Sequence, residues 1–254
     1  MKKGYTFGIV MIFLSICSIA EPAPVGNPAK PILEKGDTPF KIGFEFDFVT
    51  ERDLDVSDED VTIEKFNWYG GKISYAFADR VEPYVFLGVA GGEFTEKYPG
   101  VDLTYETETE FAWGIGATVL LYEFENGLRL GLDGKYRQAK PDIDKMTLNG
   151  VSYSPGDVGI SDFNAEYSEW QVAIGIAKEL GQFVPYAGIK YTDVETSVKA
   201  TIAGTTYKSE EVNSEEVVGI FVGCDFLPTE DFSLGVEGRF IDETSFSVTL
   251  NYRF

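Results

Sequence analysis

The sequence motif most suggestive of chemistry is the acidic stretch "DLDVSDEDVTIE". Asp53, Asp55, Ser57 and Glu64 stand at positions 1, 3, 5 and 12 of a calcium-binding EF-hand loop. Position 6 of such a loop needs glycine for its sharp turn and is Asp58 here, and the flanking residues predict strands rather than helices. Carboxylates in a flexible loop can hold Ca²⁺ more loosely, with the candidate ligands Asp53, Asp55, Asp58, Glu59 and Asp60. The simpler interpretation is a solvated acidic loop.

Charged residues of both signs also alternate with apolar residues inside several segments. In "LRLGLDGKYRQ", Leu130 and Leu132 share one face of a strand, whereas Arg129 and Asp133 share the other. Such charges could line an ion-selective pore, or they could pair and fill a narrow interior. The residues assigned to this polar face include Glu45, Asp47, Arg129, Asp133, Lys135, Arg137, Glu237 and Arg239.

The composition excludes several function classes. The chain has 42 acidic and 21 basic residues, a formal net charge of −21 and no histidine. Such acidity argues against nucleic-acid binding, which requires a basic face. A serine or water nucleophile is inert without a positioned base, so no catalytic residue and no cofactor is predicted. Cys17 and Cys224 are the only cysteines, so loss of Cys17 with a leader would leave no disulfide pair.

The beginning of the chain predicts export. "MKKGYTFGIVMIFLSICSIA" has two lysines, an apolar run and small residues, which is the pattern of a secretory signal peptide over residues 1–20, cleaved after Ala20. The alternative is a membrane-spanning helix, but the apolar run is slightly short and no charge cluster follows it. Residues 21–38 are Pro-rich and predict an extended lead-in, and residues 39–254 predict one all-β domain.

The elements that must position the charges are strands with a period of two. In the final "SFSVTLNYRF", Phe246, Val248 and Leu250 alternate with Ser247 and Thr249. Nine earlier segments show the same period, which predicts ten strands. The connections after the second, fourth, sixth and eighth strands are short, and most of the others are longer and polar. An even number of antiparallel strands with this alternation is typical of an up-and-down transmembrane β-barrel.

One strand changes phase in the middle. In "EKFNWYGGKISYAFAD", Phe66 and Trp68 follow one phase of the alternation, and Ile73 and Tyr75 follow the other. The Gly70-Gly71 pair between them predicts a β-bulge that shifts the phase.

An exported β-sandwich would show similar alternation. Two features favour the barrel: the polar face carries many glycines and charges of both signs, as a confined lumen requires, and aromatic residues recur beside the short turns, as they do at a membrane interface. These aromatic residues are Phe40, Tyr75, Phe77, Tyr84, Tyr122, Phe183, Tyr186, Phe226, Phe232 and Phe254. The apolar face of the strands is therefore predicted to meet outer-membrane lipid.

Two resemblances support this prediction. The last strand, which ends in Phe254, resembles the assembly signal of Gram-negative outer-membrane proteins, and the resemblance implies recognition by the barrel assembly machinery. "PVGNPAKP" resembles the start of the mature chlamydial major outer membrane protein, although this chain is shorter than that family's porin barrel. The barrel enzymes among outer-membrane proteins need histidine, which is missing here.

Two functions remain open at this level. One is a non-enzymatic structural or surface-interaction protein of the cell envelope with acidic extracellular loops. The other is a small porin-like channel for ions or small solutes. Ten strands enclose a narrow lumen, which favours charges that pair and fill it. The sequence leaves the oligomeric state unassigned.

Overall fold

The computed structural model describes residues 23–29, 39–56, 59–77, 80–98, 100–209, 212–214 and 216–254. Ten strands form its wall, as the sequence predicts: β1 (Phe40–Val56), β2 (Glu59–Tyr75), β3 (Val81–Tyr98), β5 (Glu110–Glu123), β6 (Leu128–Ala139), β9 (Ile160–Lys178), β10 (Phe183–Ile202), β13 (Val218–Phe226), β14 (Phe232–Phe240) and β15 (Thr244–Arg253). In the part of the chain described, no helix has the length and apolar character to span a membrane.

The sheet closes on itself. Each wall strand pairs antiparallel with its neighbours along the wall, and β1 pairs with both β2 and β15. Phe44 lies opposite Leu250 and Phe46 opposite Val248 at this seam. Closure satisfies the backbone groups that an open edge would leave unpaired in hydrocarbon. The prediction of a ten-stranded antiparallel barrel is therefore confirmed.

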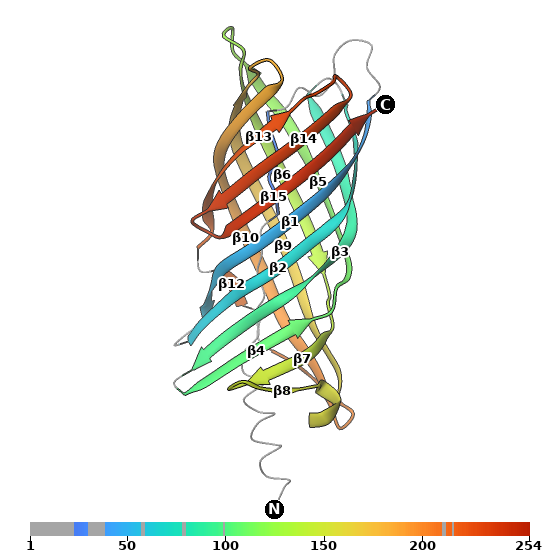
Figure 1. Cartoon of the computed structure of the whole chain (residues 1–254), viewed down its shortest axis with the longest axis vertical. Coiled ribbons are helices and arrows are strands. Elements are labelled where there is room, and N and C mark those ends of the chain that lie inside the picture. Colours follow the sequence, from blue (N-terminus) through green and yellow to red (C-terminus); the bar gives the residue numbers. More distant parts are fainter. Residues whose placement is uncertain are drawn as a thin grey trace, which may run out of the picture.

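The two ends of the cylinder differ (Figure 1). Short turns and the C-terminus lie at the upper end of the view, and further strands gather at the lower end. Those elements are β4 (Val101–Thr107), β7 (Ile143–Leu148), β8 (Val151–Tyr153), the 3₁₀ helix η1 (Pro155–Val158), β11 (Thr205–Lys208) and β12 (Val212–Ser214). Because outer-membrane barrels have short periplasmic turns and longer outer loops, we call the lower end the outer extension.

Strand β9 shows where the wall leaves the membrane. From Trp170 to Ile176 every second side chain is apolar and exposed on the outside, and the alternate residues are polar or small and buried. Before Trp170 the pattern inverts, so that Tyr167 is buried and Glu166 points outward. The paired strand β10 changes in the same way after Tyr191, whose ring packs against Trp170 with 5.2 Å between centroids. The outer face meets lipid on one side of this level and water on the other.

The predicted bulge at Gly70-Gly71 is wrong. The pairing of β2 with β1 and with β3 continues through both glycines without a shift of register. Phe66 and Trp68 are instead fully buried inside the barrel, while Ile73 is half exposed on the outside. The strand keeps its phase, but its inner face passes from a polar to an apolar environment.

The outer extension is itself a nearly closed barrel. Strand β12 bridges β1 and β10 on the outer side of β13, β14 and β15, and β4 and β7 continue the wall from β3. An isolated antiparallel bridge between Asp142, which directly precedes β7, and Asn164 of β9 connects these two strands. Its interior is an apolar core, which we call the outer core: Phe66, Trp68, Phe86, Ala90, Phe94, Leu103, Tyr105, Ala112, Ala139, Ile143, Met146, Ile160, Phe163, Ala165, Tyr167, Val194, Val198 and Ala200.

The aromatic residues beside the short turns divide into two groups. Most lie on the outside; Phe40, Tyr75 and Phe77, for example, have exposed rings. Tyr84 and Tyr186 do not, because both alternate inward and are buried in the lumen, so their assignment to the membrane interface is wrong. Position near a turn could not separate the two groups, since the phase of each strand decides the direction.

Candidate functional site

A short piece of the chain occupies the barrel lumen. Residues 23–29, which belong to the Pro-rich stretch before β1, lie inside the wall, and Ala23, Val25 and Ala29 are buried. We call residues 23–29 the luminal segment. Its apolar side chains pack with residues of β9, β10 and β13, among them Ala173 and Phe221.

Carboxylates of the wall bind the backbone of the luminal segment. The N–H of Ala23 donates to Glu169 Oε1 at 2.5 Å. The N–H groups of Val25 and Gly26 donate to the two oxygens of Glu237, each at 2.9 Å. The two carboxyl groups thus satisfy three main-chain N–H groups of the luminal segment, which pairs with no strand in the described part of the chain.

Two further contacts orient the luminal segment. Asn27 Nδ2 donates to Asp225 Oδ2 at 3.2 Å, and Lys135 Nζ donates to the Pro24 carbonyl. The wall carries glycine where the segment approaches it closely: a Cβ on Gly131 would overlap the Pro28 carbonyl. The wall is therefore shaped for a backbone at this position.

Between the luminal segment and the outer core lies a layer of buried ion pairs. We call it the central network, and it is formed by Asp47, Arg137, Glu169, Lys190, Glu237, Arg239, Asp242 and Glu243. Arg239 contacts Asp47 at 2.5 Å through Nη2 and Glu243 at 2.5 Å through Nε. Arg137 joins Asp47 at 3.2 Å to Glu169 at 2.7 Å. Each base has at least two carboxylate partners, the arrangement that buried charges need.

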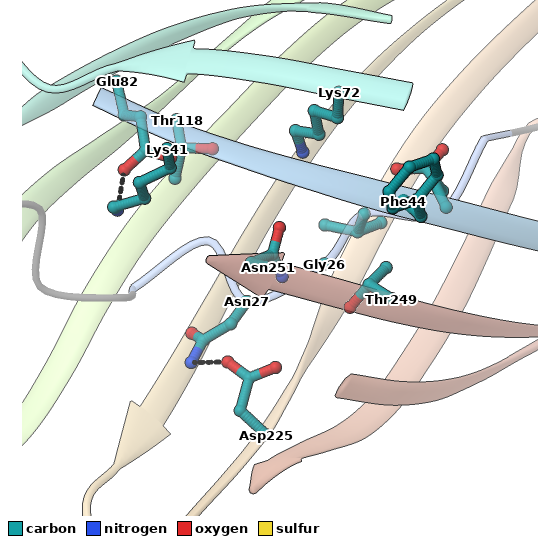
Figure 2. Close-up of a pocket in the computed structure, with 12 residues that line it drawn as sticks. Gly26, Asn27, Lys41, Phe44, Lys72, Glu82, Thr118, Asp225, Thr249 and Asn251 are labelled. Atoms are coloured by element: carbon teal, nitrogen blue, oxygen red, sulfur yellow. Dashed lines mark hydrogen bonds and ion pairs between the residues drawn. The ribbon is translucent and has the colours of Figure 1, made fainter. Parts of the chain in front are cut away.

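On the periplasmic side, smaller polar clusters line the wall. Lys41 pairs with Glu82, and the Tyr84 hydroxyl lies 3.0 Å from Asp133 Oδ2. Thr118 donates to the same oxygen at 2.9 Å. A cavity of about 60 Å³ remains between these clusters and the luminal segment. Figure 2 shows it with the Lys41–Glu82 and Asn27–Asp225 contacts at its border.

The lumen is thus occupied at three successive levels. The outer core closes the outer end with apolar side chains. The central network follows, and the guanidinium of Arg137 lies 4.1 Å from the Trp68 ring, where the two levels meet. The luminal segment fills the next level on the periplasmic side. In the described residues, the voids that remain in the lumen are small compared with a solute pathway.

The charges assigned to the polar face from sequence lie as follows. Asp47, Asp133, Arg137, Glu237 and Arg239 are buried inside the barrel, as is Glu45. Lys135 reaches the luminal segment. Arg129 lies near a short turn, where it pairs with Glu123 at 3.2 Å and Glu179 at 3.5 Å, both about half exposed.

Sequence reasoning missed part of the site. Glu169 and Lys190 alternate with outward-facing Trp170 and Tyr191, so the same period-two count would have placed both inside. Asp242 and Glu243 belong to the turn between β14 and β15, where no periodicity applies. Asp225 escaped notice because it lies at the end of its strand.

The acidic candidate calcium ligands do not lie in a free loop. Strand β1 continues to Val56 and β2 begins at Glu59, with Asp55 opposite Asp60, so the predicted loop is mostly a strand hairpin. Asp58 and the side chains of Asp53, Asp55, Glu59 and Asp60 lie outside the described part of the structure. Among the described residues, no cluster of three or more potential metal ligands is present.

The outside of the outer extension is polar and bears scattered ion pairs. Lys140 donates to Glu166 at 3.0 Å, and this hydrogen bond lowers the pKa of the Glu166 carboxyl. Lys145 pairs with Glu106, and the bond raises the pKa of the Lys145 ammonium. Exposed pairs of this kind add little stability, and they indicate a water-facing surface.

No protein-family profile matches the chain. Chlamydia trachomatis major outer membrane porins are similar in sequence: the serovar A protein is 26% identical over an alignment that covers 58% of this chain and 52% of the porin, and the serovar H protein is 25% identical with the same coverage. The chain therefore matches about half the length of these relatives.

Among solved structures, the outer membrane protease OmpT from Escherichia coli has a similar fold. It superposes with a TM-score of 0.52 over 87% of this chain and 99% of that one, at 13% sequence identity, which is evidence for the fold alone. The closed barrel with its apolar outer face and the porin relatives place the chain in the outer membrane as a β-barrel protein whose wall contacts lipid.

Proposed function

We propose that this chain is a non-conducting, non-enzymatic barrel that anchors a rigid, acidic surface structure in the outer membrane. The observation that carries the proposal is the filled lumen: the outer core, the central network and the luminal segment occupy it in succession. The outer extension supplies the surface, since its polar face points outward on strands that continue directly from the membrane wall.

The absence of enzymatic activity is part of this proposal. OmpT is named as a protease, but the likeness to it concerns the fold. This chain has no histidine to act as a base, and the carboxylates of the central network are engaged by arginine, lysine or the backbone of the luminal segment. A carboxylate held in an ion pair is poorly placed to activate water.

Planar-bilayer recording of the refolded protein tests the proposal. We expect no steady conductance, because a bare ion would have to displace paired charges and then cross the apolar outer core. A known trimeric porin, refolded and recorded in the same way, serves as the positive control. Reproducible open levels of constant size from this chain would overturn the proposal.

A porin-like channel is the second candidate. Its support is the similarity to the chlamydial porins, together with polar atoms that line the interior. Among the described residues, the side chains of Gln171 and Thr192, which lie opposite each other on β9 and β10, are buried without a hydrogen-bond partner. Groups of this kind bind water in a pathway. The same recording decides between the candidates.

The assembly partner is also proposed. Phe254 ends the chain beyond β15, its ring is exposed, and it packs edge-on against Tyr252 at 5.3 Å. We infer that the barrel assembly machinery recognises this end. Deleting Phe254 should lower the amount of folded barrel in the outer membrane of cells, yet leave the urea midpoint of protein refolded in vitro nearly unchanged, since the ring is exposed. An equal loss in both assays would mean that Phe254 acts on stability instead.

A further inference from the structure

We propose that the lumen is a peptide-binding site and that the luminal segment (residues 23–29) is an exchangeable ligand held in it. The class of ligand is an extended, proline-containing peptide whose backbone N–H groups face carboxylates. The inference goes beyond the proposed function, because a barrel could bind such a peptide whether or not it conducts ions.

Carboxylates in the wall accept hydrogen bonds from the backbone of the segment. Glu169 on β9 and Glu237 on β14 accept from main-chain N–H groups at three positions of the segment. Glu237 accepts from two consecutive residues, Val25 and Gly26, with one oxygen each. Both carboxylates are almost fully buried, so their positions are fixed by the wall and by the central network. A pre-arranged set of acceptors of this kind is a site rather than an accidental contact.

The sequence of the segment matches these acceptors. Pro24 and Pro28 have no N–H and therefore need no acceptor from the wall; at Pro24 the wall offers a donor, Lys135, to the carbonyl. Prolines also keep a chain extended before it binds, which lowers the entropic cost of binding. The Asn27 side chain adds a hydrogen bond to Asp225, and its Oδ1 accepts from the Ala29 N–H at 3.1 Å.

The shape of the wall allows the close approach. A side chain at Gly131 would overlap the backbone of Pro28, and one at Gly175 would meet the Pro28 ring at 2.9 Å. These two glycines lie opposite each other on β6 and β9. They form a flat surface against which a proline packs.

The arrangement also defines the route of exchange. The outer core and the central network close the lumen beyond Ala23. The other end of the segment contacts Asp225, near the short turns, and borders the cavity shown in Figure 2. A peptide would therefore enter from the periplasmic end.

The experiment uses a barrel that lacks residues 21–30 and a fluorescent peptide with the sequence of residues 23–30, labelled at its C-terminal lysine. We expect saturable binding, measured by fluorescence anisotropy, to the deletion variant and much weaker binding to the full chain, because its own tethered segment competes for the site. A matched peptide with N-methyl groups on Val25 and Gly26 loses both bonds to Glu237, and should bind about tenfold more weakly or worse. Equal binding of the two peptides, or no binding to a folded deletion variant, would overturn the inference.

If the deletion variant does not fold, a cleavable form of the full chain tests the same inference. A protease site placed between residues 30 and 39 of the full chain allows the barrel to fold first and the segment to be cut from it afterwards. Uptake of labelled peptide by the cut barrel supports exchange, whereas permanent retention of the original segment contradicts it. Bilayer recording of the uncut protein is scored separately: conductance there refutes the proposed function, and failure to bind peptide refutes only this inference.

Discussion

Replacement of Arg239 by leucine is expected to lower the free energy of unfolding by about 3–5 kcal/mol, the range for loss of one partner in a buried ion pair. The guanidinium contacts Asp47, Glu237 and Glu243 and is completely buried. Without it, three carboxylates face one another in a space that excludes bulk water. Urea unfolding of the barrel refolded in lipid vesicles, followed by tryptophan fluorescence, measures the change.

The matched control is Arg129→Leu. Arg129 also lies on the inner phase of its strand and also pairs with two carboxylates, but Glu123 and Glu179 are about half exposed. Solvent screens such pairs, so the loss should be about 1 kcal/mol or less. If the two variants lost equal stability, the central network would not be the buried, mutually dependent set of charges described above.

Replacement of Trp68 by alanine should lower the free energy of unfolding by a similar amount, about 3–5 kcal/mol, because it leaves a large cavity in the outer core. Trp68 is fully buried and packs against Phe66, Phe86 and Tyr167, with ring centroids 5.4–6.3 Å apart. It also covers the guanidinium of Arg137. The change should appear both as a lower urea midpoint and as faster amide hydrogen exchange in the outer extension.

Trp170→Ala provides the comparison. That indole is 43% exposed on the outside of the wall, so its removal opens no internal cavity. The decrease in the free energy of unfolding should therefore be clearly smaller for Trp170→Ala than for Trp68→Ala. The comparison also tests the direction of β2, since a bulge at Gly70-Gly71 would put Trp68 on the outside and make the two variants alike.

The wall of the barrel could be predicted from the sequence because the period of two is a local property. The alternation of each strand is visible in its consecutive residues. The barrel then requires only that each strand pairs with its neighbours in the sequence. In "EWQVAIGIAK" on β9, Trp170, Val172 and Ile174 were enough to give the outward face.

What could not be predicted is the medium that each face meets. The alternation around Phe66 and Trp68 is as regular as that around Ile73. The side chains of Phe66 and Trp68, however, face the outer core, whereas that of Ile73 meets lipid. A bulge was the natural explanation as long as apolar was taken to mean outward. The inversion depends on strands that extend beyond the bilayer, and only the three-dimensional arrangement shows this.

The contents of the lumen were equally beyond local patterns. The luminal segment has no periodicity, and its hydrogen bonds join residues more than a hundred positions apart, as Ala23 and Glu169 do. Asp242 and Glu243 lie in a turn, where solvated side chains are the usual expectation, yet both are buried against Lys190. Their role depends on the short strands β14 and β15, because these strands end at the level of the central network and place their turn there.

The length of the strands has an electrostatic consequence. From Tyr191 at the membrane boundary to Ile202 near its tip, β10 rises roughly 25 Å, at about 3.3 Å per residue and a tilt of about 45°. The Debye length at physiological ionic strength is about 8 Å, so roughly three screening lengths separate the distal hairpins from the lipid headgroups. A charged molecule that approaches from the medium therefore meets the field of the hairpins themselves, almost independently of the charge on the bilayer below.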